Sequence, residues 1–137
     1  MIAKTYNAEN AENIKSKLLE MELACFSEPW TSFDITPYSV VVTEEYGFAF
    51  GVCVSGECEL YRIAVLPEHR SRGLAYSLIR RFLSACKGRG GETVVLEVAS
   101  RNSHAIALYE KCGFTEITRR PCYYRGDDAI VMWLKLD

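Results

Sequence analysis

The sequence has no hydrophobic run long enough to cross a membrane. Its longest apolar stretch, Phe48 to Val54, falls far short of the roughly 20 residues that a bilayer-spanning helix needs. The polar start, Met1-Ile2-Ala3-Lys4, also lacks the hydrophobic region of a signal peptide. We therefore predict a cytoplasmic protein with no membrane partner.

Cysteine pairs of the C-x-x-C type are absent, although the chain has six cysteines. The two histidines, His69 and His104, are far from any cysteine pair, so the spacing supports no zinc site and we expect no metal. Nothing indicates secretion, so we expect most cysteines to be reduced and partly buried rather than joined in disulfides. The cysteines also lack the nearby histidine and acid of a thiol nucleophile.

Two common nucleotide-binding motifs are missing as well. No Gly-Lys-Ser/Thr Walker loop occurs, and no G-x-G-x-x-G follows a strand. Residues 1–66 hold ten acids against four bases, and residues 69–91 hold six bases against none. The net charge of −2 argues against direct nucleic-acid binding, because duplex affinity rests mainly on a broad basic surface. The basic stretch is still compatible with a small polyphosphate ligand.

The length of 137 residues predicts a single domain over 1–137, and 49% hydrophobic with 25% charged residues is typical of a soluble globular protein. Apolar spacing and turn residues predict a short apolar start, a helix capped by Asn7 with its stripe on the core, and then three strands, a helix, a strand, a helix and two strands. The order of elements predicts a mixed α/β (α+β) sheet with helices on its faces. The expected strands are 38–44, 48–55, 57–66, 93–98, 114–122 and 128–136, with turns at Gly47 and Gly56; the expected helices after the first are 73–87 and 102–112.

A turn rich in arginine and small residues joins a strand to a helix. It reads Arg70-Ser71-Arg72-Gly73-Leu74-Ala75. A helix start offers unpaired N–H groups and the positive end of the helix dipole, so it favours an anion. Gly73 and Ala75 allow the backbone to approach a ligand closely, and the arginines add charge. The turn therefore predicts a site for a diphosphate.

Two sequence blocks resemble the GNAT acetyltransferase superfamily. Tyr61-Arg62-Ile63-Ala64-Val65 followed by Arg70-x-x-Gly73-x-Ala75 is similar to its acetyl-CoA motif. Leu96-Glu97-Val98 followed by Asn102-x-x-Ala105-x-x-x-Tyr109-x-x-x-Gly113-Phe114 is similar to its second cofactor block. The resemblance implies a GNAT-like fold with a central, mostly antiparallel twisted sheet that is splayed at the cofactor site, with helices on both faces.

Four further segments resemble the RimI branch of that superfamily, the ribosomal-protein alanine N-acetyltransferases. The resemblance spans nearly the whole chain, and it implies transfer of an acetyl group from acetyl-CoA to the N-terminal α-amine of an acceptor protein, with a ribosomal protein as partner. The segments are Phe26 to Trp30, Leu96 to Val98, Ile106 to Glu110, and Arg120-x-x-Tyr123-Tyr124 with Asp128-Ala129-Ile130.

The resemblance also implies roles for individual residues. The amides of the turn would hold the pyrophosphate, and the strand Ile63–Val65 would pair with the pantetheine arm while the Val65 N–H polarises the thioester. Asn102 would lie near the pantetheine. The full set of implied cofactor-binding residues is Ile63, Ala64, Val65, Arg70, Ser71, Arg72, Gly73, Leu74, Ala75, Tyr76, Asn102 and Tyr109.

Glu97 and Tyr109 are the catalytic residues that the resemblance implies. Glu97 would remove a proton from the attacking amine through water, and Tyr109 would return one to the CoA thiolate as general acid. They are twelve residues apart, on a strand and on the following helix, so we expect them to face each other across a cleft. Taken without the family, each has an ordinary structural reading, as an edge carboxylate and a core tyrosine.

The acceptor is open at this point. An α-amine has a pKa of about 7.7–8.0 against about 10.4 for lysine, so an α-amine is deprotonated at neutral pH at a cost lower by roughly 3.5 kcal/mol. The family places Trp30, Tyr123 and Tyr124 at the peptide entrance. The alternatives are an acetyltransferase of a lysine side chain or small amine, and an acetyl-CoA-binding module without turnover. The oligomeric state is also open, between a monomer and a weak dimer.

Overall fold

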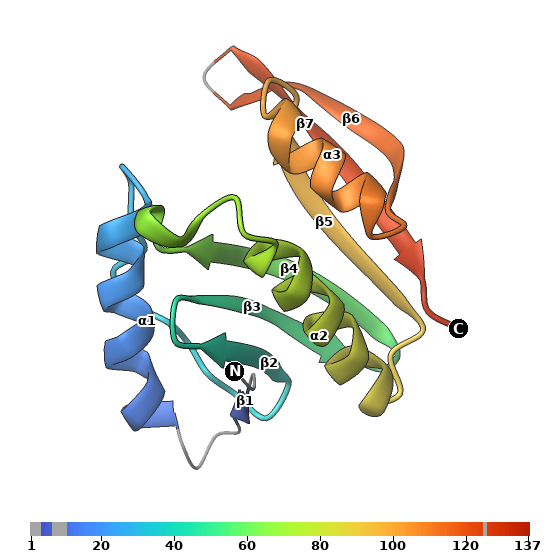
Figure 1. Cartoon of the computed structure of the whole chain (residues 1–137). Helices are drawn as coiled ribbons and strands as arrows, with labels where there is room; N and C mark the ends of the chain where they lie inside the picture. Colours follow the sequence, from blue (N-terminus) through green and yellow to red (C-terminus); the bar gives the residue numbers. More distant parts are fainter. Residues whose placement is uncertain (1–3, 7–10, 125) are drawn as a thin grey trace.

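The chain folds around one sheet with helices on both sides (Figure 1). The computed structural model describes residues 4–6, 11–124 and 126–137, with the side chains of all these except 4–6, 11–13, 122 and 124. The described strands lie in the order β1-β2-β3-β4-β5-β7-β6. The elements are β1 Lys4–Tyr6, α1 Ala11–Cys25, β2 Ser39–Glu44, β3 Gly47–Val54, β4 Glu57–Val65, the short 3-10 turn η2 Pro67–His69, α2 Leu74–Gly88, β5 Thr93–Ala99, α3 Ser103–Lys111, β6 Thr115–Tyr124 and β7 Asp127–Lys135.

The residues of β2 show how the two faces are divided. Val40 and Val42 belong to a core shared with α2 and α3, whereas Val41 between them belongs to a second core shared with α1. Successive strand residues point to opposite faces, so α1 covers one face and α2 with α3 the other. This confirms the predicted mixed sheet with helices on both faces.

The helices form where the apolar spacing predicts them. In α1, Ile14, Leu18 and Met21 are buried on one stripe, as expected. In α2, the buried side chains include Leu78, Phe82 and Cys86 at the same kind of spacing. The predicted cap of the first helix, Asn7, lies outside the described residues.

The turn predicted at Gly47 is one position off. The chain reverses at Glu45 and Tyr46, and Gly47 is the first residue of β3. A Cβ on Gly47 would lie 2.5 Å from the carbonyl oxygen of Ala64, so glycine is needed there for the close approach of β3 to β4. The turn predicted at Gly56 is confirmed, with positive φ at Ser55 and Gly56.

The strands β4 and β5 form the only parallel pair of the described sheet and stay paired over a short distance. Their register joins Glu57, Cys58 and Glu59 to Thr93, Val94 and Val95, and beyond these pairs the strands part (Figure 1). The rest of β4 pairs only with β3, and the rest of β5 only with β7. The edge of β4 that faces the gap therefore carries unpaired backbone groups.

A β-bulge changes the phase of β4 just where the gap opens. Phe50 is opposite Arg62 and Gly51 is opposite Leu60, so Tyr61 has no partner of its own on β3. Leu60 and Ile63 pack on the side of α2, whereas Arg62 contacts Glu22 of α1. Because of the extra residue, Tyr61 and Arg62 both turn toward the α1 side.

The cysteines whose side chains are described, Cys25, Cys53, Cys58, Cys86 and Cys112, are all free thiols, and four of them are buried. Burial raises the pKa of the Cys86 thiol to about 11. Among the described residues, no helix is both long and apolar enough to cross a bilayer, and no group of His, Cys, Asp or Glu is placed to hold a metal ion.

Candidate active site

The gap between β4 and β5 presents backbone donors to a ligand. The N–H of Leu66 donates to the carbonyl of Tyr46 at 2.8 Å, so Leu66 and Ala64 direct their backbone groups toward β3. In an extended strand the direction alternates, so the N–H groups of Ile63 and Val65 point to the opposite edge, into the gap. Ala64 itself is buried in the core beneath α1. The two N–H groups are therefore open to hydrogen bonding by a ligand in the gap.

The turn before α2 has the form of an anion site. Ser71 and Gly73 have φ of 64° and 78°, and Gly73 begins α2 without a side-chain cap. The first intrahelical bond runs from the Ser77 N–H to the Gly73 carbonyl, which leaves the N–H groups of the first turn, at Leu74, Ala75 and Tyr76, to a ligand. That turn contains no acidic residue, and a Cβ on Gly73 would meet no atom within 4 Å. The backbone and the space therefore fit a diphosphate.

The two arginines of this turn have different neighbours. Arg70 turns back to the protein and donates to the carbonyl of Val65 at 2.9 Å and to that of Cys25 at 3.4 Å. Arg72 is exposed and contacts only the ring of His69 among the described side chains. Arg70 thus ties the end of β4 to the end of α1, and Arg72 is the cation that faces solvent at the turn.

Glu97 lies on the open face of β5, where none of the described helices covers the sheet. It alternates with the buried Leu96 and Val98, and its side chain is 25% exposed. Its Oε1 is 3.0 Å from Nη1 of Arg120 on β6, whose side chain is 57% exposed. A partly solvated carboxylate with an exposed cationic partner can exchange that partner for another cation.

Tyr109 lies on the other face of the sheet. It is buried in the core that contains Leu96 and Val98, with its ring 6.0 Å from that of Phe114. Glu97 and Tyr109 therefore do not face each other directly, because they lie on opposite faces of β5. Asn102 begins α3, and its side chain accepts a hydrogen bond from the Ala105 N–H at 3.2 Å.

The predicted entrance residue Trp30 is held by a cluster that sequence reasoning did not find. Glu22 of α1 is completely buried and binds Arg62 at 2.9 and 2.8 Å through both carboxylate oxygens. The same carboxylate accepts the backbone N–H of Trp30 at 2.8 Å. The Arg62 guanidinium also lies over the rings of Phe26 and Trp30, at 3.8 and 4.9 Å. The sequence feature that could have indicated this cluster is Glu22 itself, a charged residue beside Met21 on the apolar stripe of α1.

On the opposite side of the gap, Tyr123 is exposed near the end of β6 and lies 5.6 Å from the guanidinium of Arg120. The side chain of Tyr124, also predicted at the entrance, lies outside the described residues. Asp127 braces this hairpin: it accepts hydrogen bonds from the Ser100 hydroxyl and from Nε of Arg101. The structure thus brings Glu97, Arg120 and Tyr123 together on one side of the gap, and Trp30 with Arg62 on the other.

Comparison with known proteins matches this arrangement to one family. Residues 24–114 match the family described as acetyltransferase (GNAT) family. The chain belongs to this family. The GNAT acetyltransferases use acetyl-CoA as the acetyl donor.

Within this family, the chain is similar to ribosomal-protein alanine N-acetyltransferases in both sequence and structure. The acetyltransferase is 40% identical over 93 residues to the ribosomal protein bS18-alanine N-acetyltransferase of Escherichia coli, covering 65% of this chain and 63% of that protein. It is 30% identical to the enzyme of that name from Haemophilus ducreyi, over 88% of this chain and 93% of the relative. The crystal structure of the Escherichia coli ribosomal-protein-S18-alanine N-acetyltransferase matches with a TM-score of 0.80 at 28% identity, over 98% and 93% of the two chains. The predicted resemblance is confirmed.

Proposed function

We propose that this acetyltransferase transfers the acetyl group of acetyl-CoA directly to the N-terminal α-amine of a ribosomal protein, with alanine as the acceptor residue. The observation that carries the proposal is the gap between β4 and β5, which has donors of β4 on one edge and Glu97 beside it on β5. The names of the relatives above support the acceptor.

On the donor side, the backbone of the turn at residues 70–73 and the first turn of α2 bind the diphosphate. The N–H of Ile63 pairs with the pantetheine arm, and the N–H of Val65 donates to the thioester oxygen as negative charge develops there. A fixed donor of this kind typically lowers the barrier by about 2.7–4 kcal/mol. Arg72 adds positive charge at the solvent side of the turn.

Glu97 acts as the base and Tyr109 as the acid. Glu97 removes the proton of the attacking amine, through a water molecule, from the open face of the sheet. Tyr109 protonates the departing thiolate from the helical face, so the two proton transfers take place on opposite sides of the gap. A single carboxylate is sufficient for an α-amine, because that amine is already partly neutral at pH 7.

The thiol of Cys25, which lies beside Val65, does not act as a nucleophile. The Sγ of Cys25 lies 3.4 Å from the carbonyl oxygen of Val65, to which it donates. Burial raises the pKa of the Cys25 thiol above its ordinary value, so the sulfur keeps its proton at neutral pH. This supports direct transfer without an acetylated cysteine.

The position of the added acetyl group tests the proposal. The protein is incubated with acetyl-CoA and a peptide that has a free N-terminal alanine and an internal lysine, and the product is sequenced by mass spectrometry. We expect acetyl on the α-amine and none on the same peptide with a blocked N-terminus. Acetyl on lysine alone would contradict the proposed acceptor and favour a lysine or small-amine acetyltransferase. Absence of a rise in melting temperature with saturating acetyl-CoA would contradict donor binding.

A further inference from the structure

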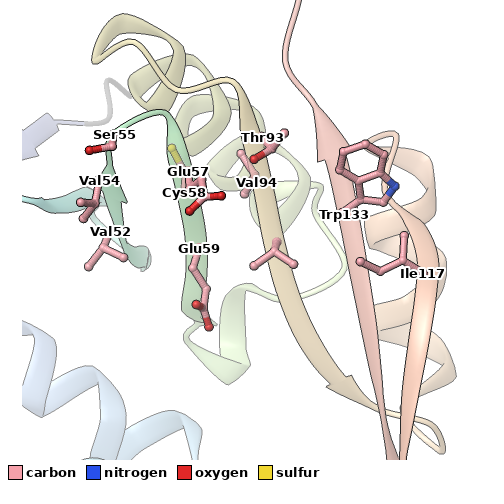
Figure 2. Close-up of a pocket in the computed structure, with 11 residues that line it drawn as sticks. Val52, Val54, Ser55, Glu57, Cys58, Glu59, Thr93, Val94, Ile117 and Trp133 are labelled. Carbon is pink, nitrogen blue, oxygen red and sulfur yellow. The ribbon is translucent and has the colours of Figure 1, made fainter.

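A hollow of about 680 Å³ lies on the open face of the sheet, apart from the gap described above. Strands β3, β4 and β5 form its floor, and Ile117 of β6 and Trp133 of β7 form one wall (Figure 2). Val54, Ile117 and Trp133 are 44%, 53% and 38% exposed. Large apolar side chains that gather in one exposed hollow are typical of a binding surface.

The hollow lies close to Glu97, the proposed base. Glu59 lines it and is paired in register with Val95, which lies two residues before Glu97 on the same face of β5. Two strand residues span about 6.6 Å and neighbouring strands lie about 4.8 Å apart, so Glu59 is within about two or three extended peptide residues of Glu97. A peptide whose amino group lies at Glu97 therefore reaches Glu59 with its second or third residue.

The charge of the hollow is negative. Its lining residues, all within the described part of the chain, include the carboxylates Glu57 and Glu59 and no lysine or arginine. Burial, with the nearby charge of Glu97, raises the pKa of Glu59 above its ordinary value, and only Arg120 opposes this. Burial and the charge of Glu97 disfavour the negative charge of Glu59, so a cation of a bound ligand would stabilise that charge.

We propose that this hollow binds the residues that follow the acceptor's N-terminal residue, and that Glu59 selects a basic side chain at the second or third position. Val52, Ile117 and Trp133 contact the methylene groups of that side chain and its neighbours, since long basic side chains bury their stems on apolar surface. The inference rests on the proposed function and adds to it a class of acceptor: a peptide with a basic residue close behind its N-terminus.

Peptide variants separate this inference from the proposed function. Three peptides begin with alanine and differ only in having arginine at position two, arginine at position three, or glutamine at both. We expect kcat/KM for the better arginine peptide to exceed that for the glutamine peptide about tenfold, the effect of one hydrogen bond to a charged group. In the Glu59→Gln variant, the ratio of kcat/KM for the arginine peptide to kcat/KM for the glutamine peptide should fall below about twofold. The control variant Glu20→Gln, which removes an exposed carboxylate on α1, should keep the parent's ratio.

The outcomes are distinguishable. Equal kcat/KM for all three peptides, or a preference that survives Glu59→Gln, would overturn the inference and leave α-amine acetylation intact. Acetylation of no α-amine would overturn both. Coverage of the hollow by a second copy of the chain would also overturn the inference. Its signs would be a dimer in sedimentation that Ile117→Glu dissociates, and an arginine preference that is the same in the dimer and in the dissociated variant.

Discussion

The two halves of the sheet hold their ion pairs in different ways. In the half formed by β1 to β4, α1 covers the face away from α2, and Glu22 is completely buried against an Arg62 that is 21% exposed. In the half formed by β5, β7 and β6, no described helix covers that face, and Glu97 and Arg120 are 25% and 57% exposed. Both pairs have short N–O distances, 2.8 and 3.0 Å.

The two ion pairs differ in whether another cation can replace the arginine. Glu22 has no access to water, so among the described residues its charge is compensated by Arg62 and the Trp30 N–H. Glu97 is partly open to solvent, and in the proposed mechanism an incoming amine takes the place of Arg120. The covered half therefore fixes the position of Trp30, and the open half presents a carboxylate whose partner can be exchanged.

The largest effect is expected at Glu97 in the open half. Glu97→Gln removes the proposed base but keeps the size of the side chain, so kcat for α-amine acetylation should fall at least about 100-fold. Acetyl-CoA should still raise the melting temperature of the variant, because its binding groups are untouched. A kcat within threefold of the parent would assign the base to another residue.

The next effect is expected at Arg62 in the covered half. Arg62→Gln leaves Glu22 buried without its cation, and breaking a buried pair in this way costs about 3–5 kcal/mol of unfolding free energy. Urea unfolding measures the loss. Replacing both partners, with Glu22→Leu and Arg62→Met, should recover most of it. A loss below about 1 kcal/mol for Arg62→Gln would remove the distinction between the two halves.

A smaller, pH-dependent effect is expected at Asp127 in the hairpin of the open half. The Ser100 hydroxyl, and then Arg101, hold the pKa of Asp127 below its ordinary value. The stabilisation is therefore present above the unfolded pKa of about 3.9 and is lost as the pH falls from there through the lower folded pKa. The unfolding free energy of the parent should decrease more than that of Asp127→Asn between pH 5 and pH 2. Parallel pH profiles would contradict this role.

The smallest effect on stability is expected at Arg120. Arg120→Gln breaks a partly solvated pair, so the unfolding free energy should change by less than about 1 kcal/mol. The same variant should alter KM for the acceptor peptide more than KM for acetyl-CoA, because Arg120 contacts Glu97, the carboxylate proposed to meet the amine. A stability loss equal to that of Arg62→Gln would show that the open half is as dependent on its ion pair as the covered half.

Local patterns predicted most of the fold, and the site only in part. The sequence predicted the apolar stripe of α1, the amphipathic α2 and the turn at Gly56, because each depends on residues that are close in the sequence. The pairing of Glu22 with Arg62 was not, since it joins residues forty positions apart. The sequence also did not predict the bulge at Tyr61, because it depends on the register between β3 and β4. The roles of Glu97 and Tyr109 stay predictions until the variants are measured.

The short parallel seam between β4 and β5 also bears on how the protein folds. Strands β1 to β4 with α1 and α2 come from one continuous stretch of chain, and β5, α3, β6 and β7 come from the next. Most strand pairs of the described sheet therefore form within one stretch, and only three register pairs join the two stretches. The hairpins β2–β3, β3–β4 and β6–β7 close small loops at low entropic cost, so each stretch can begin its own sheet before the seam forms. The opening between β4 and β5 lies where this joining of the two stretches stops.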